Sequence, residues 1–142
     1  MGFPHAPPVL DSPVVAPFWE ALDRGELRLP ACSECGRWQW YPGEAVVCHP
    51  GAPLDWREVA GTGRLYTFTT VERAFLPGGA DDVPFVVGLV ELDGVVGPRL
   101  VTVLEVEGGG EPAVGDRVHL HPVRLSTHTL PVFVVDRAAG SG

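Results

Sequence analysis

Short runs of β-forming residues, separated by glycine-containing turns, fill most of the chain after Trp56 and limit what it can fold into. The first run, Trp56–Val71, carries Gly61 and Gly63, which permit a sharp bend or a bulge. Four more runs follow at short intervals: Phe85–Leu92, Arg99–Val106, Arg117–His121 and Val132–Asp136. Five strands at this spacing predict a mainly β fold that closes into a small barrel, with a small β-sandwich as the alternative.

The segment before this region has a different character. Residues 1–16 are rich in proline, which predicts an extended arm. Pro17 then begins a short helix that ends near Gly25 and carries Phe18 and Trp19 on nearly one face with Leu22. Residues 26–30 alternate polar and apolar side chains, as a short strand does. A helix of about two turns is unstable alone, so its aromatic side chains must be buried against this chain or another subunit.

The strongest local motif is Cys32-Ser-Glu-Cys35-Gly36, followed by Cys48. Two thiolates at this spacing reach one tetrahedral Zn²⁺, and Cys48 offers a third ligand. Gly51 stands where a second Cys-x-x-Cys pair would end. The fourth ligand is therefore open between His49, Glu44, Asp55 and a more distant histidine. The alternative is a decayed zinc knuckle, whose loops are held by Trp38, Trp40, Tyr41 and Pro42.

No other pattern in the sequence defines a catalytic site. His119 and His121 share one face of an expected strand and His128 follows in a loop, which is more typical of solvated histidines than of metal ligands. Tyr66 and Phe68 are expected together on one face, in the core rather than in a base-stacking platform. A thioredoxin-type role for the cysteine pair is disfavoured, because the pair precedes a Trp- and Pro-rich stretch.

Charge and hydropathy disfavour two classes of partner, nucleic acids and membranes. A formal net charge of -8 and a pI near 4.9 oppose electrostatic binding to nucleic acid or to an anionic membrane surface. No apolar run approaches the roughly 20 residues of a membrane span, and the amino terminus does not resemble a secretion signal. With few, clustered cysteines, these features predict a cytoplasmic protein.

The order of these motifs resembles the DUF35 family, whose members join a zinc ribbon to an OB-fold and accompany acyl-CoA enzymes. The matching stretches cover about residues 14–137 and are Phe18–Leu22, Cys32–Gly36, Gly61–Thr69, Pro84–Leu92, Val114–Asp116 and Leu130–Phe133. The resemblance implies a five-stranded OB-fold-like barrel preceded by a short helix and a small zinc ribbon that is degenerate at Gly51. We accordingly divide the chain into an arm (1–16), a helix with a rubredoxin-like ribbon (17–55), a barrel (56–138) and a tail (139–142).

The resemblance also implies a function. It predicts a non-catalytic accessory subunit that docks on a thiolase-superfamily protein and helps to shape the acyl-CoA channel. The most specific version is the partner of a thiolase-like aldolase that removes a steroid side chain by retro-aldol cleavage of a CoA thioester. Alternatives are a scaffold that bridges a thiolase and another acyl-CoA enzyme, a single-stranded nucleic-acid-binding OB protein, and a stand-alone zinc hydrolase.

These expectations select three sets of residues. The candidate zinc ligands are Cys32, Cys35, Cys48 and His49. Aromatic residues that serve either as a partner interface or as packing between ribbon and barrel are Phe18, Trp19, Trp38, Trp40 and Tyr41. Acyl-CoA is anionic, so arginine is the expected contact, and the candidates are Arg64, Arg73 and Arg99.

Overall fold

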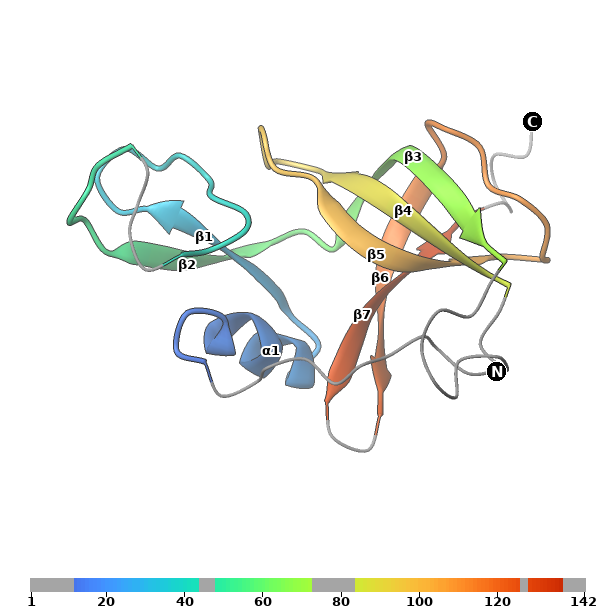
Figure 1. Cartoon of the computed structure of the whole chain (residues 1–142), viewed down its shortest axis with the longest axis horizontal. Helices are drawn as coiled ribbons and strands as arrows, with labels where there is room; N and C mark the ends of the chain where they lie inside the picture. Colours follow the sequence, from blue (N-terminus) through green and yellow to red (C-terminus); the bar gives the residue numbers. More distant parts are fainter. Residues whose placement is uncertain (1–11, 44–47, 73–83, 126–127, 137–142) are drawn as a thin grey trace.

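The computed structural model describes residues 12–43, 48–72, 84–125 and 128–136, and within them the chain forms two lobes (Figure 1). The smaller lobe holds helix α1 (Ala16–Asp23) and the antiparallel pair β1 (Leu27–Cys32) and β2 (Leu54–Val59). The larger lobe is a closed barrel of β3 (Thr62–Val71), β4 (Phe85–Leu92), β5 (Leu100–Val106), β6 (Arg117–Arg124) and β7 (Thr129–Val135). The predicted helix, ribbon and five-stranded barrel are therefore confirmed. Most of the predicted arm and the tail lie outside the described residues.

Helix α1 forms where the sequence predicts it. A proline occupies its first turn, and the chain leaves it through Gly25, whose φ of 78° suits glycine. Phe18, Ala21 and Leu22 form its buried face. Among the described residues no helix has the length and apolar character needed to cross a bilayer.

The run Trp56–Val71, expected as one bent strand, is two strands in different sheets. Its first part is β2, which pairs with β1 from Leu27↔Val59 to Cys32↔Leu54. The break comes at residues 60–61, and β3 then enters the barrel. The expectation of one strand was wrong, because residues that favour β-strands lie on both sides of the break, and a local pattern does not reveal which strand each half pairs with.

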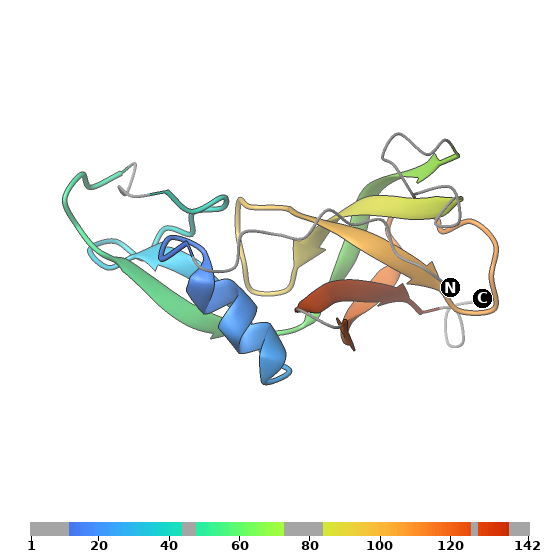
Figure 2. The same ribbon diagram turned by 60° about the horizontal axis from the view of Figure 1, so that its bottom comes forward.

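The barrel closes in the order β3-β4-β5-β7-β6, with β6 pairing back onto β3 (Figure 2). All neighbours are antiparallel except β5 and β7. Gly63 is required on β3, because a Cβ there would lie 2.2 Å from the Glu91 carbonyl oxygen of β4. The second glycine of the predicted bend therefore serves a close approach of two strands.

A β-bulge between Leu65 and Thr67 changes which side chains of β3 point inward. Leu65 is 1% exposed, Tyr66 is 45% exposed, and Phe68 packs against the core. Tyr66 and Phe68 therefore lie on different sides of the barrel wall. The expectation that both are core residues was right for Phe68 and wrong for Tyr66, because the extra residue of the bulge shifts the alternation.

One continuous apolar core joins the two lobes. It contains Phe18 and Leu22 of α1, residues of β1, and barrel residues such as Phe133. Beside this core, Asp23 at the end of α1 accepts hydrogen bonds from Arg124 at 2.7 Å and from the Thr129 hydroxyl at 2.8 Å. The helix is therefore fixed to both the ribbon sheet and the β6–β7 hairpin.

Replacing Gly63 by alanine tests the close strand approach. We expect Gly63→Ala to reduce the free energy of unfolding by about 3 kcal/mol, at the upper end for overpacking, since backbone atoms have to move. The control is Thr69→Ala, an exposed position on the same strand, which should cost less than about 1 kcal/mol. Denaturant unfolding of both variants measures the difference, and equal costs would contradict this role for Gly63.

Candidate metal centre and partner surface

Four potential metal ligands meet at the end of the ribbon. Cys32 closes β1, and the following turn, with Gly36 at a φ of 79°, returns Cys35 toward it. Cys48 and His49 come from the segment that precedes β2. The ligand atoms of these four residues lie within 4.8 Å of one another. The structure thus brings together all four predicted ligands, including the adjacent pair Cys48 and His49.

The separations suit a tetrahedral metal ion. Cys32 Sγ lies 3.5 Å from His49 Nδ1, and Cys35 Sγ lies 3.5 Å from Cys48 Sγ. Metal–sulfur bonds of about 2.3 Å place two sulfurs of a tetrahedron about 3.8 Å apart, so small adjustments suffice. Three thiolates and one imidazole are also a donor set typical of structural zinc. The other candidate Asp55 instead pairs with Arg57 at 2.8 Å, and Glu44 lies outside the described residues.

The protein environment separates the acidities of two of these thiols. Burial raises the pKa of Cys32. Hydrogen bonds from the backbone amides of Cys35 and Glu34 and from the thiols of Cys48 and Cys35 outweigh this effect and lower the pKa to about 6. Burial raises the pKa of Cys48, and contact with the other two cysteines raises it more, to about 11. The cluster therefore holds one ready thiolate before a cation arrives.

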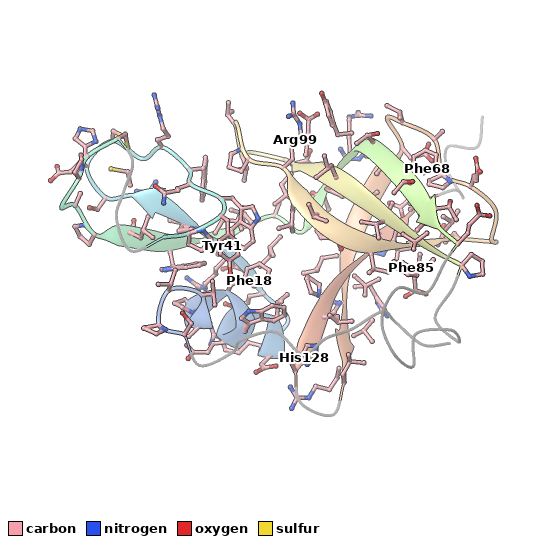
Figure 3. The ribbon with its side chains drawn as sticks, in the orientation of Figure 1. Phe18, Tyr41, Phe68, Phe85, Arg99 and His128 are labelled. Carbon is pink, nitrogen blue, oxygen red and sulfur yellow. The ribbon has the colours of Figure 1, made fainter. Side chains whose placement is uncertain are left out.

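The aromatic candidates form one connected group around α1. The Phe18 ring lies 5.1 Å from that of Trp19 and 5.0 Å from that of Trp40, and Trp40 continues to Tyr41 at 5.2 Å. Phe18 is 5% exposed, whereas Tyr41 is 66% exposed. Figure 3 shows both between the ribbon sheet and the barrel. Packing between the lobes thus accounts for Phe18, and Tyr41 offers a ring to solvent.

The other two aromatic candidates are half-buried. Trp38 packs against the core from the ribbon, where its backbone forms a bridge with Ala31. Trp19 stacks its edge against His128, with ring centroids 5.9 Å apart. His128 is itself buried, so it does not share the exposure of His121. Within the described part of the chain, the cluster of potential metal ligands contains His49 and none of His119, His121 and His128.

The arginine candidates are partly engaged. Arg99 lies 3.7 Å above the Tyr66 ring and donates to Glu91 at 3.1 Å, while Arg64 donates to the Gly115 carbonyl at 3.3 Å. Arg64 and Glu91 are cross-strand neighbours, so both arginines border one acidic side chain on the barrel exterior. Arg73 lies outside the described residues. No local sequence pattern indicates the stacking of Arg99 on Tyr66, because the two residues are far apart in the sequence.

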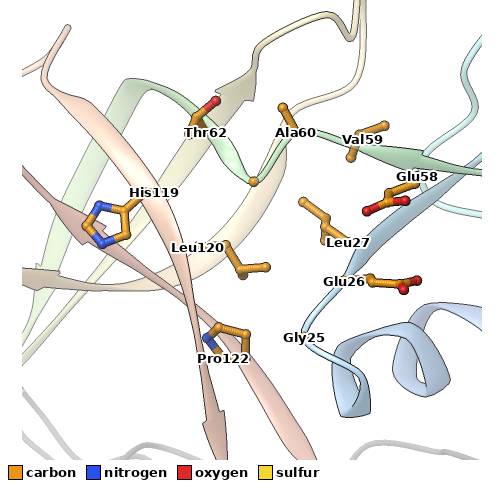
Figure 4. Close-up of a pocket in the computed structure, with 11 residues that line it drawn as sticks. Gly25, Glu26, Leu27, Glu58, Val59, Ala60, Thr62, His119, Leu120 and Pro122 are labelled. Atoms are coloured by element: carbon orange, nitrogen blue, oxygen red, sulfur yellow. The ribbon is translucent and has the colours of Figure 1, made fainter.

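Sequence reasoning also missed a cleft of about 400 Å³ where the lobes join (Figure 4). Its walls come from the turn after α1, the β2–β3 junction and β6. Of the residues that the sequence analysis singled out, Gly25, Gly61 and His119 line this cleft. None of them indicates that the turn after α1, the β2–β3 junction and β6 meet.

The fold and the cysteine cluster define a protein that joins a zinc-ribbon-type lobe to an OB-type barrel. Residues 19–50 match the model described as "ChsH2, rubredoxin-like zinc ribbon domain", and residues 56–121 match "ChsH2, C-terminal OB-fold domain". A solved structure described as "Ltp2-ChsH2(DUF35) aldolase" is 30% identical, with a TM-score of 0.75, over 92% of this chain and 98% of that one. The chain belongs to the DUF35 (ChsH2) family.

Two further relatives extend the comparison. A DUF35 protein of unknown function from Sulfolobus solfataricus shares the fold at 16% identity, with a TM-score of 0.58, over 88% of this chain and 87% of that one. The "Probable enoyl-CoA hydratase alpha subunit" of Thermomonospora curvata is 35% identical over 120 residues, which are 82% of this chain and 36% of the relative. The chain thus spans about a third of the length of that relative.

The pKa of Cys32 predicts a thiolate titration in the metal-free protein. As the pH rises through about 6, the ultraviolet absorbance of one thiolate should appear, well below the usual thiol value of about 8.5. Cys32→Ser should remove this step, and the control Ser33→Ala should keep it. A first thiolate that appears only near pH 8.5 would contradict the hydrogen-bonding role of the surrounding amides.

Proposed function

We propose that this chain is an accessory subunit of a thiolase-superfamily acyl-CoA enzyme and that the partner supplies the catalytic residues. The observation that carries the proposal is the match to the chain from the "Ltp2-ChsH2(DUF35) aldolase", which this protein covers almost completely at 30% identity. The most specific form is a partner of a thiolase-like aldolase that cleaves a steroid side-chain CoA thioester in a retro-aldol reaction. The family resemblance supports this form.

A bridging role is the second candidate. The relative named as an enoyl-CoA hydratase subunit carries a segment like this chain within a protein about three times as long. A DUF35 segment inside such a chain is suited to hold a thiolase-like protein close to a second acyl-CoA enzyme. In that case the present chain would join two enzymes rather than complete one.

We propose that Cys32, Cys35, Cys48 and His49 bind one structural zinc ion. Four protein ligands leave no open position for a substrate, and this favours a structural over a catalytic ion. When bound, zinc cross-links the end of β1 to the segment that carries Cys48 and His49. The ribbon lobe has a small two-stranded sheet, so such a cross-link would contribute substantially to its stability.

We further propose how the partner and the acyl-CoA are contacted. Tyr41, in contact with Trp40, would lie against the partner together with the half-buried Trp19, and Phe18 and Trp38 would support these rings from the core. Arg64 and Arg99, with Arg73, would face the phosphate groups of CoA near that interface. We retain the division at residues 16/17, 55/56 and 138/139 as part of this proposal, with β2 (Leu54–Val59) as the strand that runs across the 55/56 boundary.

Elemental analysis tests the metal. Purified protein should contain about one zinc per chain. Cys35→Ser should lose the metal, and its free energy of unfolding, measured with denaturant, should fall by several kcal/mol. Ser33→Ala, in the same turn, is the control and should retain the metal. Wild-type protein that stays metal-free with unchanged stability after zinc addition would contradict a structural zinc site.

Co-expression tests the partner. A thiolase-like protein encoded beside this chain should co-purify with it, and this partner should gain aldolase activity or solubility in the complex. The isolated chain should turn over no acyl-CoA. Tyr41→Ala should weaken the complex about tenfold or more, as truncation of an aromatic hot spot does. Val96→Ala, another exposed apolar position, should leave the affinity unchanged. Turnover by the isolated chain would overturn the accessory role.

A further inference from the structure

The cleft between the two lobes combines an apolar floor with an acidic rim. Val59, Leu120 and Pro122 supply aliphatic surface, and Leu27, which is 2% exposed, closes the bottom of the cleft opposite Leu120 (Figure 4). Glu26 and Glu58 lie on the side formed by the ribbon lobe. Such a lining suits a guest with an aliphatic stem and a cationic end.

The two carboxylates differ in what they already bind. Glu26 accepts hydrogen bonds from Arg28 at 3.1 Å and Arg24 at 3.5 Å. Glu58 is exposed and lies opposite Arg28 in the β1–β2 register, but none of the ion pairs in the described residues includes it. Glu58 is therefore the carboxylate with full capacity for an incoming cation.

The opposite wall adds no competing positive charge. His119 of β6 directs its ring away from Leu120 (Figure 4). Its Nδ1 lies 2.8 Å from Asp136 Oδ1. Thr62 donates its hydroxyl to Asp93 at 2.7 Å. The protein carries a formal net charge of -8, so the long-range field also favours a cation.

We propose that this cleft binds an arginine side chain from an extended segment of a partner protein. The guanidinium would pair with Glu58, and the methylene stem would lie on the partly exposed Val59, Leu120 and Pro122. A free amino acid is disfavoured, because its own carboxylate would face the acidic rim, whereas a peptide backbone is neutral. Since both lobes line the cleft, the arginine would contact the ribbon and the barrel at once. That the partner is the thiolase-like subunit rests on the proposed function.

A peptide titration tests the chemistry of the cleft without the partner. The probe is the blocked tripeptide acetyl-Leu-Arg-Leu-amide, added to the zinc-loaded full chain and followed by backbone amide chemical shifts. We expect shifts concentrated at Gly25, Ala60 and Gly61, and weaker binding of the citrulline analogue, which keeps the shape and removes the charge. Equal binding of both peptides, shifts elsewhere, or no binding would overturn the proposal.

Variants locate the interaction. Glu58→Gln should weaken binding of the arginine peptide about three- to fivefold, the range for an exposed ion pair, and Ala60→Leu should block it by filling the cleft. The control Glu72→Gln, an exposed carboxylate at the end of β3, should have no effect. Unchanged affinity in both cleft variants would overturn the assignment. Concentration-dependent shifts at the same amides without peptide would identify a second copy of this chain as the occupant instead, and would also overturn it.

The complex supplies the final comparison. With the thiolase-like partner, Glu58→Gln should raise the dissociation constant by a similar factor, while Glu72→Gln should not. If the partner binds both variants equally although the peptide assay succeeds, the arginine does not come from this partner and that part of the proposal fails. If no thiolase-like partner binds the wild-type chain, the proposed function fails, and the peptide titration still decides whether the cleft recognises arginine.

Discussion

The insertion of helix α1 into the junction of the two lobes is the contact on which the rest of the structure depends. Phe18 and Leu22 are buried in a core that includes both β1 and the barrel. A two-stranded sheet has too little apolar surface to stabilise itself, so the ribbon depends on this shared core. The polar contacts of Asp23 with Arg124 and Thr129 fix the direction from which the helix enters.

This packing changes the physical argument for a partner. From the sequence, a short aromatic helix is too poorly stabilised to stand without additional burial, which another subunit could provide. The structure satisfies most of that requirement within the chain, since Phe18 is 5% exposed and its ring contacts Trp19 and Trp40. The case for a partner therefore rests on the similarity to the chain from the Ltp2-ChsH2 aldolase and on surfaces such as the Tyr41 ring.

Sequence patterns predicted the parts of the fold that local chemistry determines. Proline and glycine mark the ends of α1, and the cysteine spacing selects Cys32 and Cys35 as candidate ligands, which the structure brings together with Cys48 and His49. Sequence patterns failed where a shift of one residue in strand register, or a pairing between distant segments, decides where a side chain lies. The bulge after Leu65 turns Tyr66 outward, and no local feature shows that Val59 pairs with Leu27 while Thr62 pairs with His119. The cleft depends on those distant pairings, so it too was beyond the reach of sequence patterns.

The same break between β2 and β3 that defeats the strand prediction creates the binding geometry. Because one strand run is divided between two sheets, the acidic ribbon residue Glu58 is held a few residues from Gly61, which lies against Leu120 of the barrel. A continuous strand would have kept Glu58 within the barrel wall. The division of this run into β2 and β3 places the carboxylate of Glu58, from the ribbon lobe, next to the apolar surface of the barrel. Recognition at this junction would therefore depend on the relative placement of the lobes, which α1 and the shared core hold fixed.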